Sequence, residues 1–135
     1  MSYLALDYGS KRVGVAISDP QHRMALPHSV LNLSDCFKAI VELVEKKSVT
    51  RVIVGLPRSL SGKDTPSTAA ARNFAEQLKQ HVSVPIVLYD ERFTTTVALR
   101  QQRAAGIKDR QSRSTIDALA AAALLESYLA FILKQ

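Results

Sequence analysis

Three acidic residues, each placed where a short apolar segment starts or stops, are the part of this chain that could do chemistry. Asp7 lies in LDYG at residues 6–9, Glu91 in YDER at 89–92 and Asp117 in IDAL at 116–119. Carboxylates brought from separate elements to one edge of a sheet form a hard-oxygen site that suits a divalent ion such as Mg²⁺ or Mn²⁺. In a basic protein, such a site indicates phosphodiester chemistry on nucleic acid.

Each acid also has an ordinary structural explanation. Asp7 could simply bond the amides of the turn that follows it, and the acids at 90 and 91 could be solvated charges at a strand end. Ser114 and Asp117 fit the spacing of a capping box, which would place Asp117 at the start of a helix. The alanine-rich run at 118–123 favours the site interpretation, because small side chains let a helix lie close to a sheet.

Of the two adjacent acids, Glu91 is the better candidate. Neighbouring residues of a strand point to opposite faces, so only one of Asp90 and Glu91 is expected to join Asp7. If one strand separates the two that carry Asp7 and Glu91, their axes lie roughly 10 Å apart, a gap that a glutamate bridges better than an aspartate. Gly55 at the end of the intervening strand would leave room, and Arg92 could neutralise Asp90 or bind a phosphate.

The apolar pattern predicts an α/β fold. Strands are expected over 3–8, 13–18 and 25–33, the last interrupted at Pro27, then over 49–56 and 84–89. Helices are expected after Ser34, from Thr65 to about 81, from Thr94 or Thr95 to about 105, and from Ser114 to about 133. An antiparallel β-meander followed by αβαβα predicts a five-stranded mixed sheet with helices on both faces, in one domain spanning residues 1–135.

Basic residues near the acidic motifs are the candidate contacts to nucleic acid. Eighteen Lys and Arg against twelve Asp and Glu give a net charge of +6, which favours an anionic partner. The segment 100–113 is expected to be a helix end running into an exposed basic loop, which could also be merely solvated. The candidate phosphate contacts are Lys11, Arg12, Lys63, Arg92, Arg100, Arg103, Lys108, Arg110 and Arg113.

Composition narrows the setting in which this chain works. Cys36 is the only cysteine, so no internal disulfide can form; it is expected to be a buried helix residue in a cytoplasmic protein. No apolar run approaches the roughly 18 residues of a membrane span, and no signal peptide is expected at the N-terminus. No membrane partner is therefore expected.

Taken together, these motifs resemble the YqgF family of small bacterial proteins with an RNase H-like fold, which are related to Holliday junction resolvases. The matching segments are LDYGSKRVGVA at 6–16, VGLP at 54–57, DERFTT at 90–95 and IDALAA at 116–121. The resemblance implies an RNase H-like fold and an acidic triad of Asp7, Glu91 and Asp117. Two departures are notable: many related resolvases carry the second acid on the fourth strand, where this chain has Gly55, and Ser61 stands where family loops often have an acid.

The expected function is that of an endonuclease that depends on Mg²⁺ or Mn²⁺ and acts on structured nucleic acid. The resemblance favours processing of the 5′ end of pre-16S ribosomal RNA, with the ribosome as a further partner and the protein as a monomer or weak homodimer. One alternative is resolution of Holliday junctions in branched DNA, which would require a dimer. Another is a non-catalytic RNA-binding or transcription factor. A third, a phosphotransferase of the actin type, would need two such domains closing over ATP.

Overall fold

In the computed structural model of this chain, residues 1–59, 61–93 and 110–133 are described. The helix expected near residues 94–105 lies outside these ranges, as do Arg100, Arg103 and Lys108. The side chains of Arg110 and Arg113 are also outside the described part.

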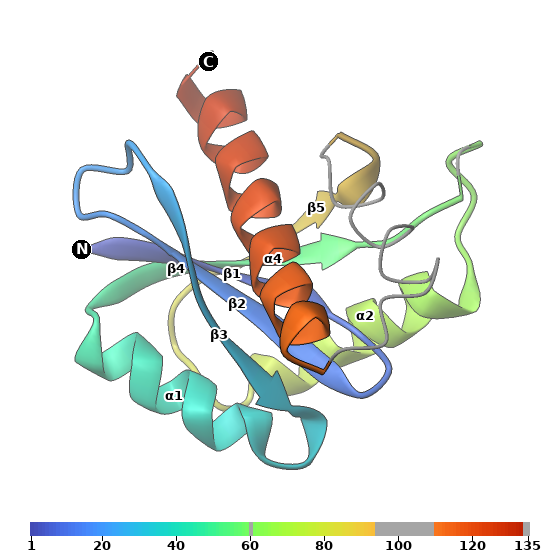
Figure 1. The fold of residues 1–135 in the computed structure, drawn as a ribbon, viewed down its shortest axis with the longest axis horizontal. Coiled ribbons are helices and arrows are strands. Elements are labelled where there is room, and N and C mark those ends of the chain that lie inside the picture. The colour runs from blue at the N-terminus through green and yellow to red at the C-terminus, as the bar shows by residue number, and fades with distance from the viewer. Residues whose placement is uncertain (60, 94–109, 134–135) are drawn as a thin grey trace.

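A five-stranded mixed sheet forms the centre of the fold (Figure 1). Its strands are β1 (Ser2–Tyr8), β2 (Arg12–Ser18), β3 (Ala25–Asn32), β4 (Val49–Leu56) and β5 (Ile86–Asp90). The order across the sheet is β3-β2-β1-β4-β5. The first three strands pair antiparallel, whereas β4 runs parallel to both β1 and β5. The carboxyl ends of β1, β4 and β5 therefore meet at one edge, as predicted.

Helices cover both faces of this sheet (Figure 1). The helical elements are a 3₁₀ turn (Leu33–Asp35), α1 (Cys36–Lys46), α2 (Pro66–Leu78), a second 3₁₀ turn (Glu91–Phe93) and α4 (Arg110–Leu133). Helices α1 and α2 pack on one face, and α4 crosses the other over β1, β2 and β3. The predicted α/β architecture is confirmed.

Side chains that alternate along the strands divide the core into two clusters. Leu4 and Leu6 of β1 point toward α1 and α2, while Ala5 between them points toward α4. The α4 face of the sheet is built from small residues, including Ala5 and Ala16, and α4 meets them with Ala121 and Ala122. This pairing of small side chains brings α4 close to the sheet. Cys36 is buried on the opposite face, as expected, and burial raises the pKa of its thiol.

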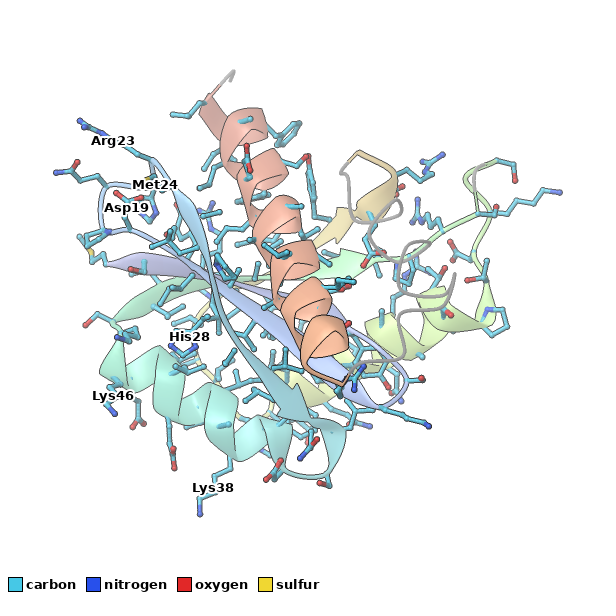
Figure 2. All side chains as sticks on the ribbon, in the orientation of Figure 1. Asp19, Arg23, Met24, His28, Lys38 and Lys46 are labelled. Carbon is cyan, nitrogen blue, oxygen red and sulfur yellow. The ribbon has the colours of Figure 1, made fainter. Side chains whose placement is uncertain are left out.

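Local sequence signals explain where several elements begin and turn. Thr65 and Thr68 form a reciprocal capping box ahead of Pro66, so α2 begins where the sequence predicts. Pro27 lies in the edge strand β3, where the pairing with β2 shifts register, so its missing N–H costs little. In the turn between β2 and β3, the Asp19 carboxylate accepts hydrogen bonds from the amides of Arg23 and Met24 (Figure 2).

Two expectations about the elements are wrong. Helix α4 already includes Arg110, so Ser114 is inside the helix and does not cap it. The basic loop expected ahead of Ser114 consequently does not reach residue 113, because residues 110–113 already belong to α4. Strand β5 is the edge strand of the sheet, and its Leu88 is exposed.

The expectation that no apolar run reaches membrane-spanning length is also wrong. By length and composition, the segment Ile116–Leu133 of α4 is apolar enough to cross a membrane, with mean hydropathy 1.8. In the fold, 56% of this segment is buried, and its small residues pack on the sheet. Length and composition are weak indications by themselves, because core helices of soluble proteins share both properties. The packing therefore accounts for the hydrophobicity of α4.

Candidate active site

Asp7 lies near the end of β1, between two strands that each contribute a glycine. On one side it pairs directly with Gly14 of β2. On the other side lies β4, whose pairing with β1 ends at Leu6 and Val54. The next residue of each strand is Asp7 in β1 and Gly55 in β4, so these two are neighbours. Since Ala5 belongs to the cluster under α4, Asp7 two residues later points to the same face. The two glycines leave open the space on either side of its carboxylate.

At Gly14 the backbone of α4 comes very close to the sheet. A Cβ on Gly14 would lie 2.1 Å from the backbone oxygen of Asp117, a distance that no real side chain could accept. The backbone of α4 thus rests directly on β2, beside the strand that carries Asp7. Asp117 is well inside the helix, so the capping-box explanation of this residue is wrong. Its carboxylate is 3.0 Å from the Nε of Arg12, which donates a hydrogen bond to it.

Gly55 has the same role on the other side of Asp7. A Cβ at this position would meet the Oε1 and Cγ of Glu91 at 2.7 and 3.0 Å. Glu91 begins the 3₁₀ turn that follows β5, and its side chain lies against Gly55 at the end of β4. The reach toward Asp7 that favoured a glutamate over an aspartate in the sequence is thus seen as far as β4.

The donor set at this edge of the sheet suits a hard divalent cation. Asp7, Glu91 and Asp117 are all nearly inaccessible, with exposures of 3%, 1% and 3%. Carboxylate oxygens are the ligands that Mg²⁺ and Mn²⁺ prefer, and burying three carboxylates is costly unless cations or donors compensate them. In the part of the chain that the structure describes, no three His, Cys, Asp or Glu side chains are already grouped to hold a metal ion. A shared ion would therefore require side-chain rotation, with Asp117 turning away from Arg12.

Comparison with known proteins decides the family. The family model described as "RuvX: Holliday junction resolvase" matches residues 1–130. The chain belongs to the RuvX family. The resemblance expected from the sequence motifs is thereby confirmed.

Named relatives of this RuvX chain extend over most of its length. A protein of Maridesulfovibrio salexigens named "Putative pre-16S rRNA nuclease" is 40% identical over 133 residues, which are 96% of this chain and 98% of that protein. A protein of the same name from Mycobacteroides abscessus is 43% identical and covers 93% of this chain and 79% of its own.

Among solved structures, RuvC of T. thermophilus in complex with a Holliday junction substrate shares the fold. It has a TM-score of 0.59 and 16% identity, and the match covers 98% of this chain and 96% of that one. The identity is low enough that this likeness establishes the RNase H-like fold alone.

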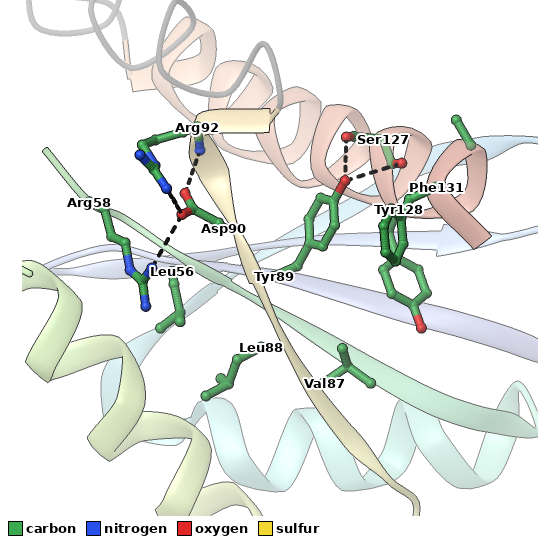
Figure 3. A pocket seen from close by; sticks show the side chains of 11 residues that line it. Leu56, Arg58, Val87, Leu88, Tyr89, Asp90, Arg92, Ser127, Tyr128 and Phe131 are labelled. Atoms are coloured by element: carbon green, nitrogen blue, oxygen red, sulfur yellow. Dashed lines mark hydrogen bonds and ion pairs between the residues drawn. The ribbon is translucent and has the colours of Figure 1, made fainter. Parts of the chain in front are cut away.

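Asp90 of this RuvX chain is turned away from the three buried acids. Its carboxylate accepts hydrogen bonds from the backbone amide and the Nε of Arg92, at 2.9 and 3.0 Å (Figure 3). Arg58 approaches the same carboxylate to 3.5 Å. Burial alone would raise the pKa of Asp90, but the hydrogen bonds from Arg92 and the charges of Arg92 and Arg58 lower it below its ordinary value. Of the two interpretations of Arg92, pairing with Asp90 is therefore the one observed.

Arg58 and Arg72 were not singled out in the sequence. Arg58 follows the end of β4 and pairs across an isolated bridge with Asp64, whose carboxylate also binds Arg72. The loop between them turns at Gly62, whose φ of 85° lies in the left-handed region, and the Arg92 guanidinium packs against it. Asp7 was selected because it lies where a strand ends, and Arg58 could have been selected for the same reason, since it follows the end of β4. The contact of Arg72 with Asp64 depends on how the chain enters α2, because Asp64 directly precedes the N-cap Thr65 and Arg72 lies inside the helix.

Two remaining basic candidates with described side chains, Lys11 and Lys63, lie in loops that follow strands ending at this edge. Lys11 is exposed in the turn between β1 and β2, next to Arg12, and Lys63 is exposed in the loop after β4. Arg110 and Arg113 belong to the first turns of α4, on the same helix as Asp117. The roles of these residues toward nucleic acid remain predictions.

Proposed function

We propose that this RuvX chain is a metal-dependent endonuclease that hydrolyses phosphodiester bonds in structured nucleic acid. The observation that carries the proposal is the placement of Asp7 between Gly14 and Gly55, which brings the backbone of Asp117 and the side chain of Glu91 to either side of it. Family membership supports the reaction class, because the matching family is described as a resolvase.

In this proposal, Asp7, Glu91 and Asp117 hold the cation, and Asp7 is the central ligand. When bound, one or two Mg²⁺ or Mn²⁺ ions would activate a water for attack at phosphorus and stabilise the leaving oxygen. Arg12 would bind a substrate phosphate and, in doing so, release the Asp117 carboxylate. Lys11, Lys63, Arg110 and Arg113 would add contacts to the backbone without reading sequence, and Arg100, Arg103 and Lys108 are proposed as further contacts.

The proposed substrate is a precursor of 16S ribosomal RNA in the cytoplasm, with cleavage at its 5′ end. The support is the name shared by the curated relatives, which match nearly the whole chain at about 40% identity. The family description favours a second candidate, resolution of a Holliday junction in DNA. Symmetric cutting of a junction needs two active sites, so that activity requires a homodimer.

The deciding experiment is a cleavage assay on a precursor 16S RNA fragment and a synthetic four-way DNA junction, each in Mg²⁺, Mn²⁺ or EDTA. We expect Asp7→Asn to abolish cutting while retaining the fold, because it removes the central negative charge at constant size. The variant is purified alongside the wild type, so that a contaminating nuclease would appear in both preparations. The preferred substrate chooses between the two candidate activities.

Thermal melting supplies a readout that does not depend on turnover. Millimolar Mg²⁺ or Mn²⁺ should raise the Tm of the wild type, since binding to the native state alone stabilises it, and should have a smaller effect on Asp7→Asn. Equal Tm values with and without metal, together with uncut substrates, would contradict the proposal. Retained RNA binding in that case would indicate a non-catalytic RNA-binding factor.

A further inference from the structure

An open groove runs along β5 and the C-terminal half of α4, beginning beside the candidate active site. Its volume is about 760 Å³, and Leu56 and Asp90, the neighbours of Gly55 and Glu91, lie at its start. From there it passes along β5 to Val87 and along α4 to Phe131 (Figure 3). This groove is here called the β5–α4 groove.

Aromatic side chains line the β5–α4 groove in fixed orientations. The Tyr89 hydroxyl is 2.9 Å from the Ser127 Oγ, and its ring packs edge-on against Tyr128 at 5.5 Å between centroids. Phe131 follows at 6.0 Å from Tyr89 and remains 48% exposed. A large aromatic side chain that is held beside others and still open to solvent is a ready platform for stacking a planar ligand.

The end of the groove nearest the candidate active site carries guanidinium groups. Two arginines, Arg58 and Arg92, line it with one acid, Asp90, and Asp64 pairs with Arg58 from outside the lining. Arg58 reaches its acidic partners only at 3.3 and 3.5 Å, which is long for charge-assisted hydrogen bonds of about 2.7–2.9 Å. A phosphate oxygen could therefore compete for this guanidinium.

We propose that the β5–α4 groove binds an unpaired segment of the nucleic-acid substrate, with a base stacked on Phe131 and phosphates beside Arg58 and Arg92. The inference rests on the proposed function, because it identifies the substrate as a duplex with a single-stranded extension next to the cleavage site. The groove is too small for a double helix, but its volume falls in the range of about 300–1,000 Å³ typical of sites for small organic molecules. Charge favours nucleic acid over an apolar peptide, given the net charge of +6 on the whole chain.

The test measures binding without cleavage, in EDTA, using a hairpin RNA with or without a four-nucleotide single-stranded extension at either end. The extension carries 2-aminopurine, whose fluorescence is quenched when it stacks. We expect wild type to prefer the extended RNA and to quench the probe. Phe131→Ala should lower the affinity for extended RNA about tenfold and remove the quenching, while binding of the blunt hairpin stays unchanged.

Leu133→Ala is the matched control, since Leu133 is an exposed apolar residue on the same helix that does not line the groove. It should retain the preference and the quenching. Unchanged binding and quenching in Phe131→Ala would overturn the proposal. Loss of a dimer in Phe131→Ala by light scattering, with RNA binding intact, would instead assign the groove to a second copy of the chain. The binding assay requires no cutting, so its outcome is independent of the cleavage assay. If Phe131→Ala lost affinity and quenching but the wild type cut no substrate, the proposed nuclease function would be wrong and the assignment of the groove would stand.

Discussion

At the scale of single residues, the candidate site depends on a competition for one carboxylate. Asp117 is 4% exposed at its side chain and is bonded by Arg12, which is itself 27% exposed. The guanidinium supplies positive charge to a buried acid where, in our proposal, a metal ion would also bind. Arg12 is therefore expected to stabilise the metal-free fold and to oppose metal binding until a phosphate engages it.

Replacing Arg12 by methionine, which keeps much of the apolar length, tests this competition. Arg12→Met should lower the free energy of unfolding by about 2 kcal/mol in EDTA, because it removes the donor paired with a buried charge. Added Mg²⁺ should then raise the Tm of the variant by more than it raises that of the wild type. Urea denaturation and melting curves measure the two effects.

The natural control is Lys11→Met, which removes the neighbouring exposed charge. It should leave both quantities unchanged. If Arg12→Met responded to Mg²⁺ no more than the wild type, Arg12 and the ion would not share Asp117.

At the scale of secondary-structure elements, two close contacts position the acids, and they differ in kind. At Gly14 the neighbour is the backbone of α4, whereas at Gly55 the nearest atoms belong to the flexible side chains of Glu91 and Leu124. The first contact sets the distance between α4 and the sheet. The second leaves a space that the Glu91 carboxylate fills.

The two glycine-to-alanine variants should therefore behave differently. Gly14→Ala should destabilise the fold by about 3 kcal/mol or more, since a backbone contact can be relieved only by moving α4. Gly55→Ala should cost only about 1 kcal/mol, because Glu91 can rotate away, but it should abolish the rise in Tm with Mg²⁺. Urea denaturation gives the stabilities, and metal titration followed by melting gives the second readout.

These two variants control for each other, since each adds one methyl group on the same face of the sheet. Equal destabilisation by both would contradict the distinction between backbone and side-chain contacts. A Gly55→Ala protein that still gained stability from Mg²⁺ would remove Glu91 from the proposed ligands.

At the scale of the whole molecule, the positive charge is spread over more than the candidate site. Lys38 and Lys46 project from α1 (Figure 2), which covers the face of the sheet opposite α4. Only some of the basic residues are therefore close enough to the carboxylate edge to contact a substrate there. The charge distribution, more than its total, decides how binding responds to salt.

Binding of RNA should weaken with salt along a straight line in a plot of log K against log salt concentration. Lys11→Gln and Lys63→Gln should each make the slope shallower by about one unit, because each removes one phosphate contact. Lys38→Gln and Lys46→Gln are the controls on α1 and should leave the slope as it is. Fluorescence anisotropy of labelled RNA in EDTA, over a series of salt concentrations, gives the slope for each of the four variants. Equal changes of slope in the loop variants and the α1 variants would refute a localised interface.

The strand segments could be predicted, and the candidate acids proposed, from the sequence because both depend on local patterns. Alternating or continuous apolar runs predicted all five strands, and the Thr65-Pro66 signal predicted the start of α2. The preference for Glu91 over Asp90 followed from side-chain reach, and the structure turns Asp90 toward Arg92 and Arg58 instead.

Tertiary structure alone decided what depends on contacts between distant segments. The start of α4 was mispredicted because Ser114 has a capping spacing, whereas the helix already begins at Arg110. The pairing of Arg12 with Asp117 joins residues 105 positions apart, and the β5–α4 groove needs an edge strand beside the far end of a helix. Local propensity determines which elements form, but the close approach of α4 at Gly14 and the space left at Gly55 determine where their side chains meet.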